Sequence, residues 1–222
     1  MAIKPILFNT EMVRAILEGR KSCTRRLVKF LSGENPRWTG YIKDGLMLYN
    51  GRNEPCIRKA PYQPGDTLYV RETWHKYIKR VGEGESCHLA EFYGYKASIA
   101  NSEDADEPWK PSIHMPKEAA RIWLRVTDVR VERLQEITED QTEEEGFLFT
   151  PPCLHITGEN YCDIDGPCTS EIKYCDMGAG ELFGKVLWNS TIKKSDLDSY
   201  GWDASPWVWV IEFERCEKPQ EV

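Results

Sequence analysis

Residues 19–26 read Gly-Arg-Lys-Ser-Cys-Thr-Arg-Arg and follow directly on a segment with the pattern of a short amphipathic helix. Apolar residues recur at helical spacing within residues 12–17. Asn9 or Thr10 can cap the start of this helix, and Gly19 suits the left-handed residue that often ends one. The sequence therefore predicts a helix that ends near Gly19 and leads into a basic strand.

This strand is unusually basic for the chain that carries it. The formal net charge of the protein is -7, yet residues 20–29 contain a cluster of cations. The cations are Arg20, Lys21, Arg25, Arg26 and Lys29. A surface strand with solvated charges is one explanation of the cluster. A site in which a lysine, the Thr24 hydroxyl and paired arginines act together is the other.

Two segments carry a resemblance to a known family. The run Gly-Arg-Lys-x-x-Thr-x-Arg after an N-terminal helix resembles the signature of the ASCH superfamily, small PUA-like β-barrel proteins linked to RNA. Residues 137–147, Ile-Thr-Glu-Asp-Gln-Thr-Glu-Glu-Glu-Gly-Phe, resemble the helix that follows a barrel strand in that family. Residues 110–116 and 206–213 are similar to segments of uncharacterised phage-encoded ASCH proteins. The resemblance covers residues 3–29, 62–74, 109–147 and 181–214.

Some ASCH proteins are amidohydrolases that remove the acetyl group from N4-acetylcytidine, and the resemblance implies catalytic roles for Lys21, Thr24 and Glu145. A threonine hydroxyl is a weak nucleophile until a base takes its proton, and Lys21 is such a base if burial among cations lowers its pKa. Glu145 ends a short helix beside Glu143 and Glu144, which predicts a raised pKa and a role as general acid or base. A solvated acidic helix end is the alternative for Glu145.

Further residues are candidates for binding the substrate. The arginines Arg20, Arg25 and Arg26 are suited to hold phosphate or a polar base edge. Glu72 is a second carboxylate on a predicted strand, and a salt bridge to Arg25 or Arg26 is its alternative role. His114 is a candidate for contact with a base or a phosphate, with a structural role as the alternative.

The chain has eight cysteines, and four of them fall in one loop-like segment. In a reducing compartment clustered cysteines indicate a metal rather than disulfides. The four candidate ligands of a structural zinc are Cys153, Cys162, Cys168 and Cys175. The segment lacks a Cys-x-x-Cys pair, so reduced thiols without a metal are the alternative. No other cofactor is expected.

The patterns predict an α+β fold, and the resemblance implies a small mixed β-barrel of the PUA-like (ASCH) type with a few flanking helices and long loop insertions. We expect one domain over residues 1–222, with insertions at about 75–108 and 148–178. An alternation of apolar residues that changes phase near residues 127–128 predicts a β-bulge. The expected strands are residues 5–8, 67–74, 121–131 and 207–213, and the last of them is apolar enough to be buried. Later helices are expected at residues 138–146 and 182–189. Thr138 and Gln141 have the spacing of a capping box at the start of the first of these helices, and Gly146 is expected to end it.

The composition limits the classes of partner that we expect for this protein. No apolar run has the length of a membrane span and residues 1–6 lack a signal-peptide pattern, so we expect a soluble cytoplasmic protein that has no membrane partner. A host cytoplasm is implied if the chain is phage-encoded. The acidic net charge argues against general coating of DNA, because that needs many phosphate contacts. The oligomeric state is left open.

Three functions follow from these observations. The first is an ASCH-fold protein that recognises RNA or a modified nucleoside and hydrolyses an amide such as that of N4-acetylcytidine. The second is a binding module for RNA or a modified base that breaks no bond. The third is a ribonuclease in which Lys21 and Arg26 stabilise a phosphorane and Glu145 is the base.

Overall fold

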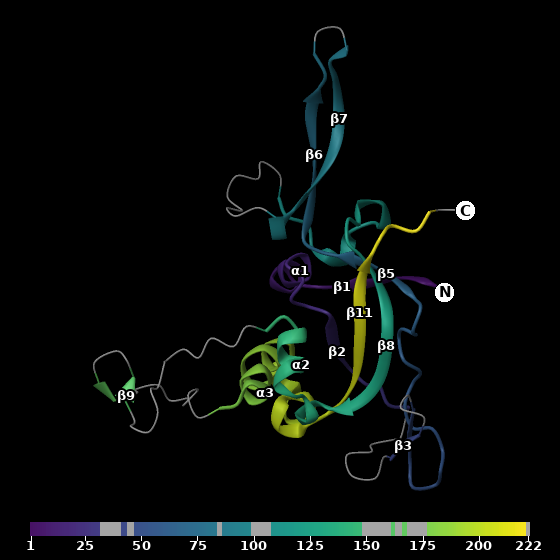
Figure 1. Ribbon diagram of the computed structural model, residues 1–222, viewed down its shortest axis with the longest axis vertical. Coiled ribbons are helices and arrows are strands. Elements are labelled where there is room, and N and C mark those ends of the chain that lie inside the picture. Colours follow the sequence, from purple (N-terminus) through teal and green to yellow (C-terminus); the bar gives the residue numbers. More distant parts are fainter. Residues whose placement is uncertain are drawn as a thin grey trace. The chain divides into compact units, whose positions relative to one another are not determined.

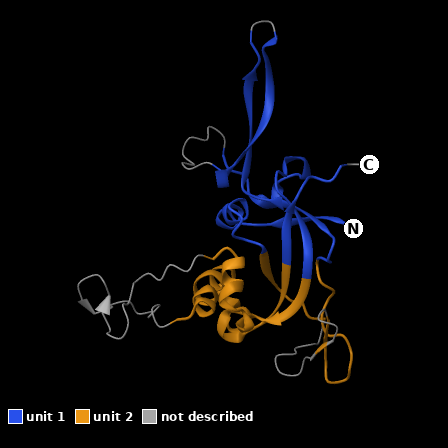
Figure 2. Cartoon of the chain, in the orientation of Figure 1, with its two compact units in different colours: residues 1–22, 62–128, 212–222 blue, residues 23–61, 129–211 orange. Residues whose placement is uncertain are grey.

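The chain has an α+β fold that divides into two compact units (Figure 2). The computed structural model describes residues 1–31, 41–43, 47–83, 86–98, 108–147, 161–162, 166–167 and 177–220. Unit 1 consists of residues 1–22, 62–128 and 212–222, and unit 2 consists of residues 23–61 and 129–211. Each unit is therefore assembled from segments that are far apart in the sequence.

The described strands form one five-stranded sheet and three two-stranded sheets (Figure 1). The five-stranded sheet has the order β1-β5-β8-β11-β2, with β1 parallel to β5 and β5 antiparallel to β8. Its strands are β1 (Ile3–Leu7), β5 (Thr67–Arg71), β8 (Trp123–Arg133), β11 (Trp207–Cys216) and β2 (Cys23–Leu27). The two-stranded sheets pair β3 (Tyr41–Lys43) with β4 (Met47–Tyr49), β6 (Trp74–Val81) with β7 (His88–Tyr95), and β9 (Tyr161–Cys162) with β10 (Gly166–Pro167).

Short helices connect these strands, so the predicted α+β class is confirmed. The α-helices of the described residues are α1 (Thr10–Leu17), α2 (Glu139–Glu144), α3 (Ala179–Leu182), α4 (Asn189–Thr191) and α5 (Leu197–Tyr200). A π-helix, η8 (Phe183–Trp188), joins α3 to α4. Single 3-10 turns are η2 (Lys96–Ser98), η4 (Ser112–His114), η5 (Lys117–Ala119), η6 (Leu134–Glu136), η9 (Lys194–Asp196) and η10 (Trp202–Ala204). Within the described ranges no helix has both the length and the apolar character needed to cross a membrane.

Helix α1 has the capping that its sequence predicts. The Asn9 side chain accepts a hydrogen bond from the backbone N–H of Met12 at 2.8 Å, and Gly19 has a φ of +78°. Asparagine is a preferred N-cap because its oxygen satisfies an N–H that has no partner within the helix. Val13 and Ile16 form the buried face of the helix. The start, the end and the buried face of α1 were therefore all predicted correctly.

Strand β8 shows the expected change of phase. Leu124 and Val126 are buried in unit 1, whereas Val129 and Val131 are buried in unit 2. Between them Thr127 is exposed. Successive side chains of a regular strand point to opposite faces, so Leu124 and Val126 share one face and Val129 and Val131 the other unless a residue is inserted between them. The β-bulge itself stays a prediction.

The predicted insertion at residues 75–108 contains a β-hairpin, β6 and β7, which pairs eight residues of each strand. Strand β6 starts at Trp74, so the expected strand 67–74 is divided between β5 and β6. Within the hairpin, Ile78 of β6 and Leu89 of β7 are largely exposed. The hairpin thus adds a two-stranded element to unit 1 rather than a plain loop. Residues 99–107, and most of the predicted insertion at 148–178, lie outside the described residues.

The core of unit 2 closes around the aromatic side chains of its helices. It consists of Leu134, Ile137, Phe183, Trp188, Trp202, Val208 and Val210. Gly184 of the π-helix lies against the ring of Trp202. The backbone N–H of Trp202 donates a hydrogen bond to the side-chain oxygen of Asn189 at 2.8 Å. Gln135 donates to the carbonyl of Trp202 at 3.0 Å. Hydrogen bonds therefore fix the backbone of Trp202, and Gly184 packs on the face of the Trp202 ring.

A buried aspartate ties together the start of unit 1. Asp66 accepts hydrogen bonds from the backbone N–H of Ala2 at 3.0 Å, from Lys4 Nζ at 2.7 Å and from the backbone N–H of Gln63 at 3.0 Å. Burial by itself raises the pKa of this carboxyl, but the bonds from Lys4, Ala2 and Gln63 outweigh it and the pKa lies below its ordinary value of 3.8. The folded protein therefore favours the ionised carboxylate.

Replacing Gly184 by alanine is expected to destabilise unit 2. A Cβ at this position would lie 1.9 Å from Cε3 of Trp202, a distance that requires the ring or the helix to move. Overpacking of a close-packed core lowers the free energy of unfolding by about 1–3 kcal/mol, which urea unfolding measures. Gly178→Ala is the matched control, because its Cβ would meet nothing within 4 Å. Equal unfolding midpoints for the two variants would contradict the packing described for Trp202.

Asp66 is expected to make stability fall in acid. Because its pKa is lower in the folded protein than in the unfolded chain, its contribution is complete above the ordinary carboxyl pKa of 3.8 and is lost as the pH falls through the folded value. Asp66→Asn should lower the free energy of unfolding at pH 7 and flatten its decline below about pH 4. Urea titrations at pH 7, 4 and 3 measure both effects. The exposed Asp203→Asn is the control and should keep the wild-type slope.

Candidate functional site

Strand β2 buries the centre of the basic motif instead of exposing it. Cys23, Thr24 and Arg25 are 0%, 2% and 5% exposed, respectively, whereas Arg26 is half-buried. Charged side chains are almost never buried to this degree unless they are paired. The alternative of a surface strand with solvated charges is therefore wrong for Lys21 and Arg25, whereas Lys29 of the same cluster is exposed.

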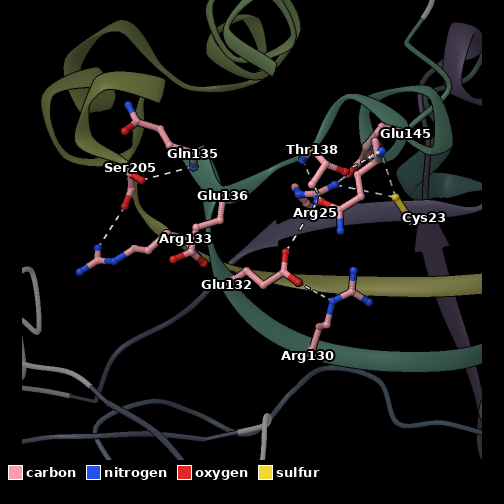
Figure 3. Close-up of polar contacts among 11 residues, drawn as sticks. Cys23, Arg25, Arg130, Glu132, Arg133, Gln135, Glu136, Thr138, Glu145 and Ser205 are labelled. Carbon is pink, nitrogen blue, oxygen red and sulfur yellow. Dashed lines mark hydrogen bonds and ion pairs between the residues drawn. The ribbon is translucent and has the colours of Figure 1, made fainter. Parts of the chain in front are cut away.

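Arg25 lies among acceptors from β8 and α2 (Figure 3). Its Nη1 lies 3.3 Å from Oε1 of Glu145, and its Nη2 donates to Oε1 of Gln141 at 2.7 Å. Oε2 of Glu132 is 3.7 Å from the same Nη2. The guanidinium is thus shared between two carboxylates and one amide, all of them in unit 2. Its third donor, Nε, is buried and has no hydrogen-bond partner among the described residues.

The capping of α2 positions two of these acceptors. The Thr138 side chain accepts from the backbone N–H of Gln141, and the Gln141 side chain accepts from the backbone N–H of Thr138, which is the capping box that the sequence predicts. The same Gln141 oxygen also accepts from Arg25. At the other end of α2, Glu145 is the C-cap, and Gly146, with a φ of +77°, ends the helix as predicted.

Glu145 differs from its two neighbours in the acidic run. Glu143 and Glu144 are exposed, whereas Glu145 is 4% exposed and pairs with Arg25. The solvated helix end that we gave as the alternative role of Glu145 is therefore wrong. The acidic residue that the resemblance selected is the one that folding buries.

Glu132 extends the buried network along β8. It forms an ion pair with Arg130 in addition to its contact with Arg25 (Figure 3). Two arginines and two glutamates therefore alternate through this part of unit 2. The sequence analysis did not identify Glu132 or the role of Gln141 in binding Arg25. For Gln141 the capping box was a local signal, whereas the pairing of Glu132 with β2 depends on strand order alone.

Thr24 has a different orientation from its neighbours on β2. Cys23 and Arg25 meet each other, with Sγ 3.8 Å from Nη1, on the face of the strand that contacts α2. Because side chains alternate along a strand, the hydroxyl of Thr24 leaves β2 on the opposite face. The hydroxyl is buried there.

Lys21 and Arg20 belong to unit 1, whereas Thr24 and Glu145 belong to unit 2. Lys21 is 4% exposed, its Nζ lies 5.6 Å from the centre of the Phe8 ring, and its backbone N–H donates to the carbonyl of Ala15. An ammonium over an aromatic face is held by the quadrupole of the ring. Arg20 is half-buried and forms an ion pair with Glu18. The convergence of Lys21, Thr24 and Glu145 on one site stays a prediction.

Glu72 is paired within unit 1 by a residue that the sequence analysis did not name. Its two oxygens accept from Nε and Nη2 of Arg121, each at 2.9 Å. The guanidinium of Arg121 also lies over the ring of Tyr95, 4.1 Å from its centre. The expected salt bridge of Glu72 to Arg25 or Arg26 is therefore wrong. Arg121 follows Glu72 by 49 residues, and only the antiparallel pairing of β5 with β8 brings these regions together.

The remaining candidate site residues are His114 and the four cysteines of the predicted zinc site. His114 is exposed at the end of η4. Cys153, Cys168 and Cys175 lie outside the described residues, as does the side chain of Cys162. Over the described part of the chain, no group of three or more His, Cys, Asp or Glu side chains is arranged to hold a metal ion. The zinc site stays a prediction.

Breaking the buried pair is expected to destabilise the protein strongly. In Arg25→Met the carboxylate of Glu145 loses its buried cation, and the loss of one partner of such a pair lowers the free energy of unfolding by about 3–5 kcal/mol. The double variant Arg25→Met/Glu145→Gln should lose less than the sum of the two single variants. Urea unfolding of all four proteins gives the coupling energy.

An exposed ion pair of the same unit is the control. Lys185 Nζ lies 2.6 Å from Glu181 one helical turn away, and both side chains are partly exposed. Lys185→Gln should leave the unfolding midpoint unchanged, because exposed pairs contribute little. Strictly additive effects of Arg25→Met and Glu145→Gln would show that the two side chains do not interact in solution.

Comparisons with protein-family models, with curated proteins and with solved structures each found nothing that matches this chain. The likeness to ASCH proteins therefore rests on the sequence alone, on residues 19–26 and 137–147 and on the further segments 110–116 and 206–213.

Proposed function

We propose that this protein has the PUA-like fold of the ASCH superfamily and recognises RNA or a modified nucleoside through the motif of residues 20–26. The observation that carries the proposal is the burial of polar side chains in and around this motif. Of the described chain, eight polar or charged residues are buried: Lys21, Thr24, Arg25, Asp66, Glu72, His75, Thr142 and Glu145. Four of these eight are Lys21, Thr24 and Arg25 of the motif and Glu145, the glutamate that the family resemblance selects.

Such burial is unfavourable unless the protein gains something from it. Taking a charge out of water is costly even when it is paired, and a pair of apolar residues of similar volume is often as stable. The unpartnered Nε of Arg25 adds to this cost, because a buried donor without an acceptor destabilises by about 1–3 kcal/mol. A functional role is one of the known reasons for a buried polar atom that has no partner. The motif is therefore better explained by recognition than by stability.

Hydrolysis of an N4-acyl cytidine is the reaction that we assign to this site. Lys21, Thr24 and Glu145, the three residues that the resemblance implies, are all buried. Thr24 Oγ attacks the acetyl carbonyl while Lys21 takes its proton. The Glu145 carboxylate receives this proton from Lys21 and passes it to the leaving amine as the C–N bond breaks. Water then hydrolyses the acyl-threonine, which returns a proton to Thr24 Oγ and releases acetate. Arg25 acts as a positioning residue that holds the Glu145 carboxylate.

A binding module without catalysis is the second candidate. The observation that favours it is the ion pair of Glu145 with Arg25, together with the orientation of Thr24 away from that pair. In this candidate the buried network shapes a pocket for a modified base. The ribonuclease is the third, and it shares Glu145 as base with Lys21 and Arg26 as cations for the phosphorane.

Acetate release from N4-acetylcytidine tests the first candidate. We expect turnover by the wild-type protein and none by Thr24→Val, which keeps the shape of the side chain and removes the nucleophile. Thr24→Ser keeps a hydroxyl and should retain activity. Glu145→Gln should lower turnover by about 10²- to 10⁴-fold, as is typical for loss of a general acid or base. Glu72→Gln is the carboxylate control and should lower stability without lowering turnover of the folded protein.

Other outcomes select among the candidates. Binding of acetylcytidine or RNA by the wild-type protein without release of acetate would exclude the hydrolase and support the binding module. Cleavage of an RNA oligonucleotide that is lost in Glu145→Gln would support the ribonuclease. Full activity of Thr24→Val would exclude Thr24 as nucleophile, and circular dichroism of each variant separates loss of activity from loss of folding.

A further inference from the structure

Unit 2 contains a cavity of about 520 Å³ that none of the proposed roles uses. Its walls come from the end of β2 and the residues after it, from the end of β8, from the α5 region and from the start of β11. All of these segments lie in unit 2. Cavities that hold small molecules in proteins have volumes of about 300–1,000 Å³, so this one has the size of a ligand site.

The charged residues that line this cavity are all positive. Lys29 and Arg133 are among its lining residues, and none of the lining residues is acidic. Lys29 is exposed, whereas burial lowers the pKa of the Arg133 guanidinium, an effect that nearby Glu136 opposes. A cation that is partly removed from water interacts more strongly with an anion. The cavity is therefore electrostatically suited to a negatively charged group.

Arg133 is fixed in position by its surroundings. The guanidinium carbon lies 4.2 Å from the centre of the Trp207 ring, and Nη1 donates to the carbonyl of Ser205 at 3.0 Å. Figure 3 shows Arg133 directed toward Ser205, while Gln135 binds the hydroxyl of the same serine. A cation held before the ligand arrives loses little conformational entropy on binding.

The backbone that holds Arg133 is strained. Ser205 has φ of 40° and ψ of 59°, the left-handed region that non-glycine residues rarely adopt. Strained residues of this kind cluster at ligand sites, where the surrounding structure keeps them in place. Here the strain presents the Ser205 carbonyl to Arg133 and leads directly into Pro206 and Trp207 of the cavity wall.

Aromatic side chains form the other part of the lining. Phe30, Tyr200 and Trp207 all contribute to the cavity, and Tyr200 is 39% exposed. Aromatic faces bind planar rings by stacking, and a base on such a face contributes about 1–3 kcal/mol. A ligand that matches both halves of the cavity therefore has a planar ring and an anionic group.

We propose that this cavity binds a nucleoside 5′-monophosphate, with its phosphate on Lys29 and Arg133 and its base against the aromatic side chains. The site is distinct from residues 20–26 and from Glu145, and it requires no covalent step. A nucleoside 5′-monophosphate is either a free metabolite or the 5′ end of a strand, and the two share the chemistry that the cavity selects. The inference does not depend on the hydrolase.

Isothermal titration calorimetry with CMP and AMP tests the site in the full chain. We expect saturable binding by the wild-type protein, weaker binding of the nucleosides that lack phosphate, and weaker binding of inorganic phosphate that lacks the ring. Lys29→Gln should weaken CMP binding by about tenfold, the value of one charge-assisted hydrogen bond. Tyr200→Leu should weaken CMP and leave inorganic phosphate unchanged. Both side chains are exposed, so neither replacement should unfold the protein.

The control removes the same charge elsewhere in unit 2. Lys194 is exposed and does not line the cavity, so Lys194→Gln should bind CMP as the wild type does. A 5′-phosphorylated oligonucleotide that binds more tightly than CMP would support the site and identify a strand end as its source. Equal affinity for CMP and inorganic phosphate, or equal loss in Lys29→Gln and Lys194→Gln, would overturn the proposal. Acetate release by Lys29→Gln should equal that of the wild type, so failure of one proposal is distinguishable from failure of the other.

Discussion

The burial of the Arg25 guanidinium is the constraint on which the organisation of unit 2 depends. A cationic side chain that is 1% exposed must be matched by acceptors, because its desolvation is otherwise prohibitive. Gln141 and Glu145 from α2 and Glu132 from β8 supply them. Helix α2 is therefore held against β2 by a charge that would lose two of its three acceptors, Gln141 and Glu145, without it. Its six residues would not form a stable helix in isolation.

The pairing with Arg25 also explains why the three glutamates at the end of α2 differ in burial. Three consecutive glutamates look equivalent in a sequence, but only one of them faces β2. Glu145 is the C-cap, and the helical turn that ends at Gly146 places it beside Arg25 while Glu143 and Glu144 stay in water. A charged residue is thus selected by the position of the helix end, which a glycine with positive φ determines.

Unit 2 also combines two kinds of cation. Arg25 is enclosed and neutralised by carboxylates, whereas Arg133 is stacked on Trp207 and faces a cavity with no acidic lining. The first arrangement orients residues of the motif, and the second presents positive charge. The two arginines therefore have different surroundings although both lie on strands of the same sheet. In unit 1 the pairs Lys4–Asp66 and Arg121–Glu72 are structural in character, because each links segments of the fold.

The sequence by itself determined the features that depend on near neighbours. The caps of α1 and α2, the glycines that end them, the change of phase in β8 and the buried strand at residues 207–213 were all predicted, because each is encoded within a few residues. The family resemblance also selected Glu145. Only the tertiary structure decided which charges pair, since Arg25 and Glu145, or Glu72 and Arg121, are brought together by strand order over long separations. Pairing energy depends on distance and burial, and neither is a property of local sequence.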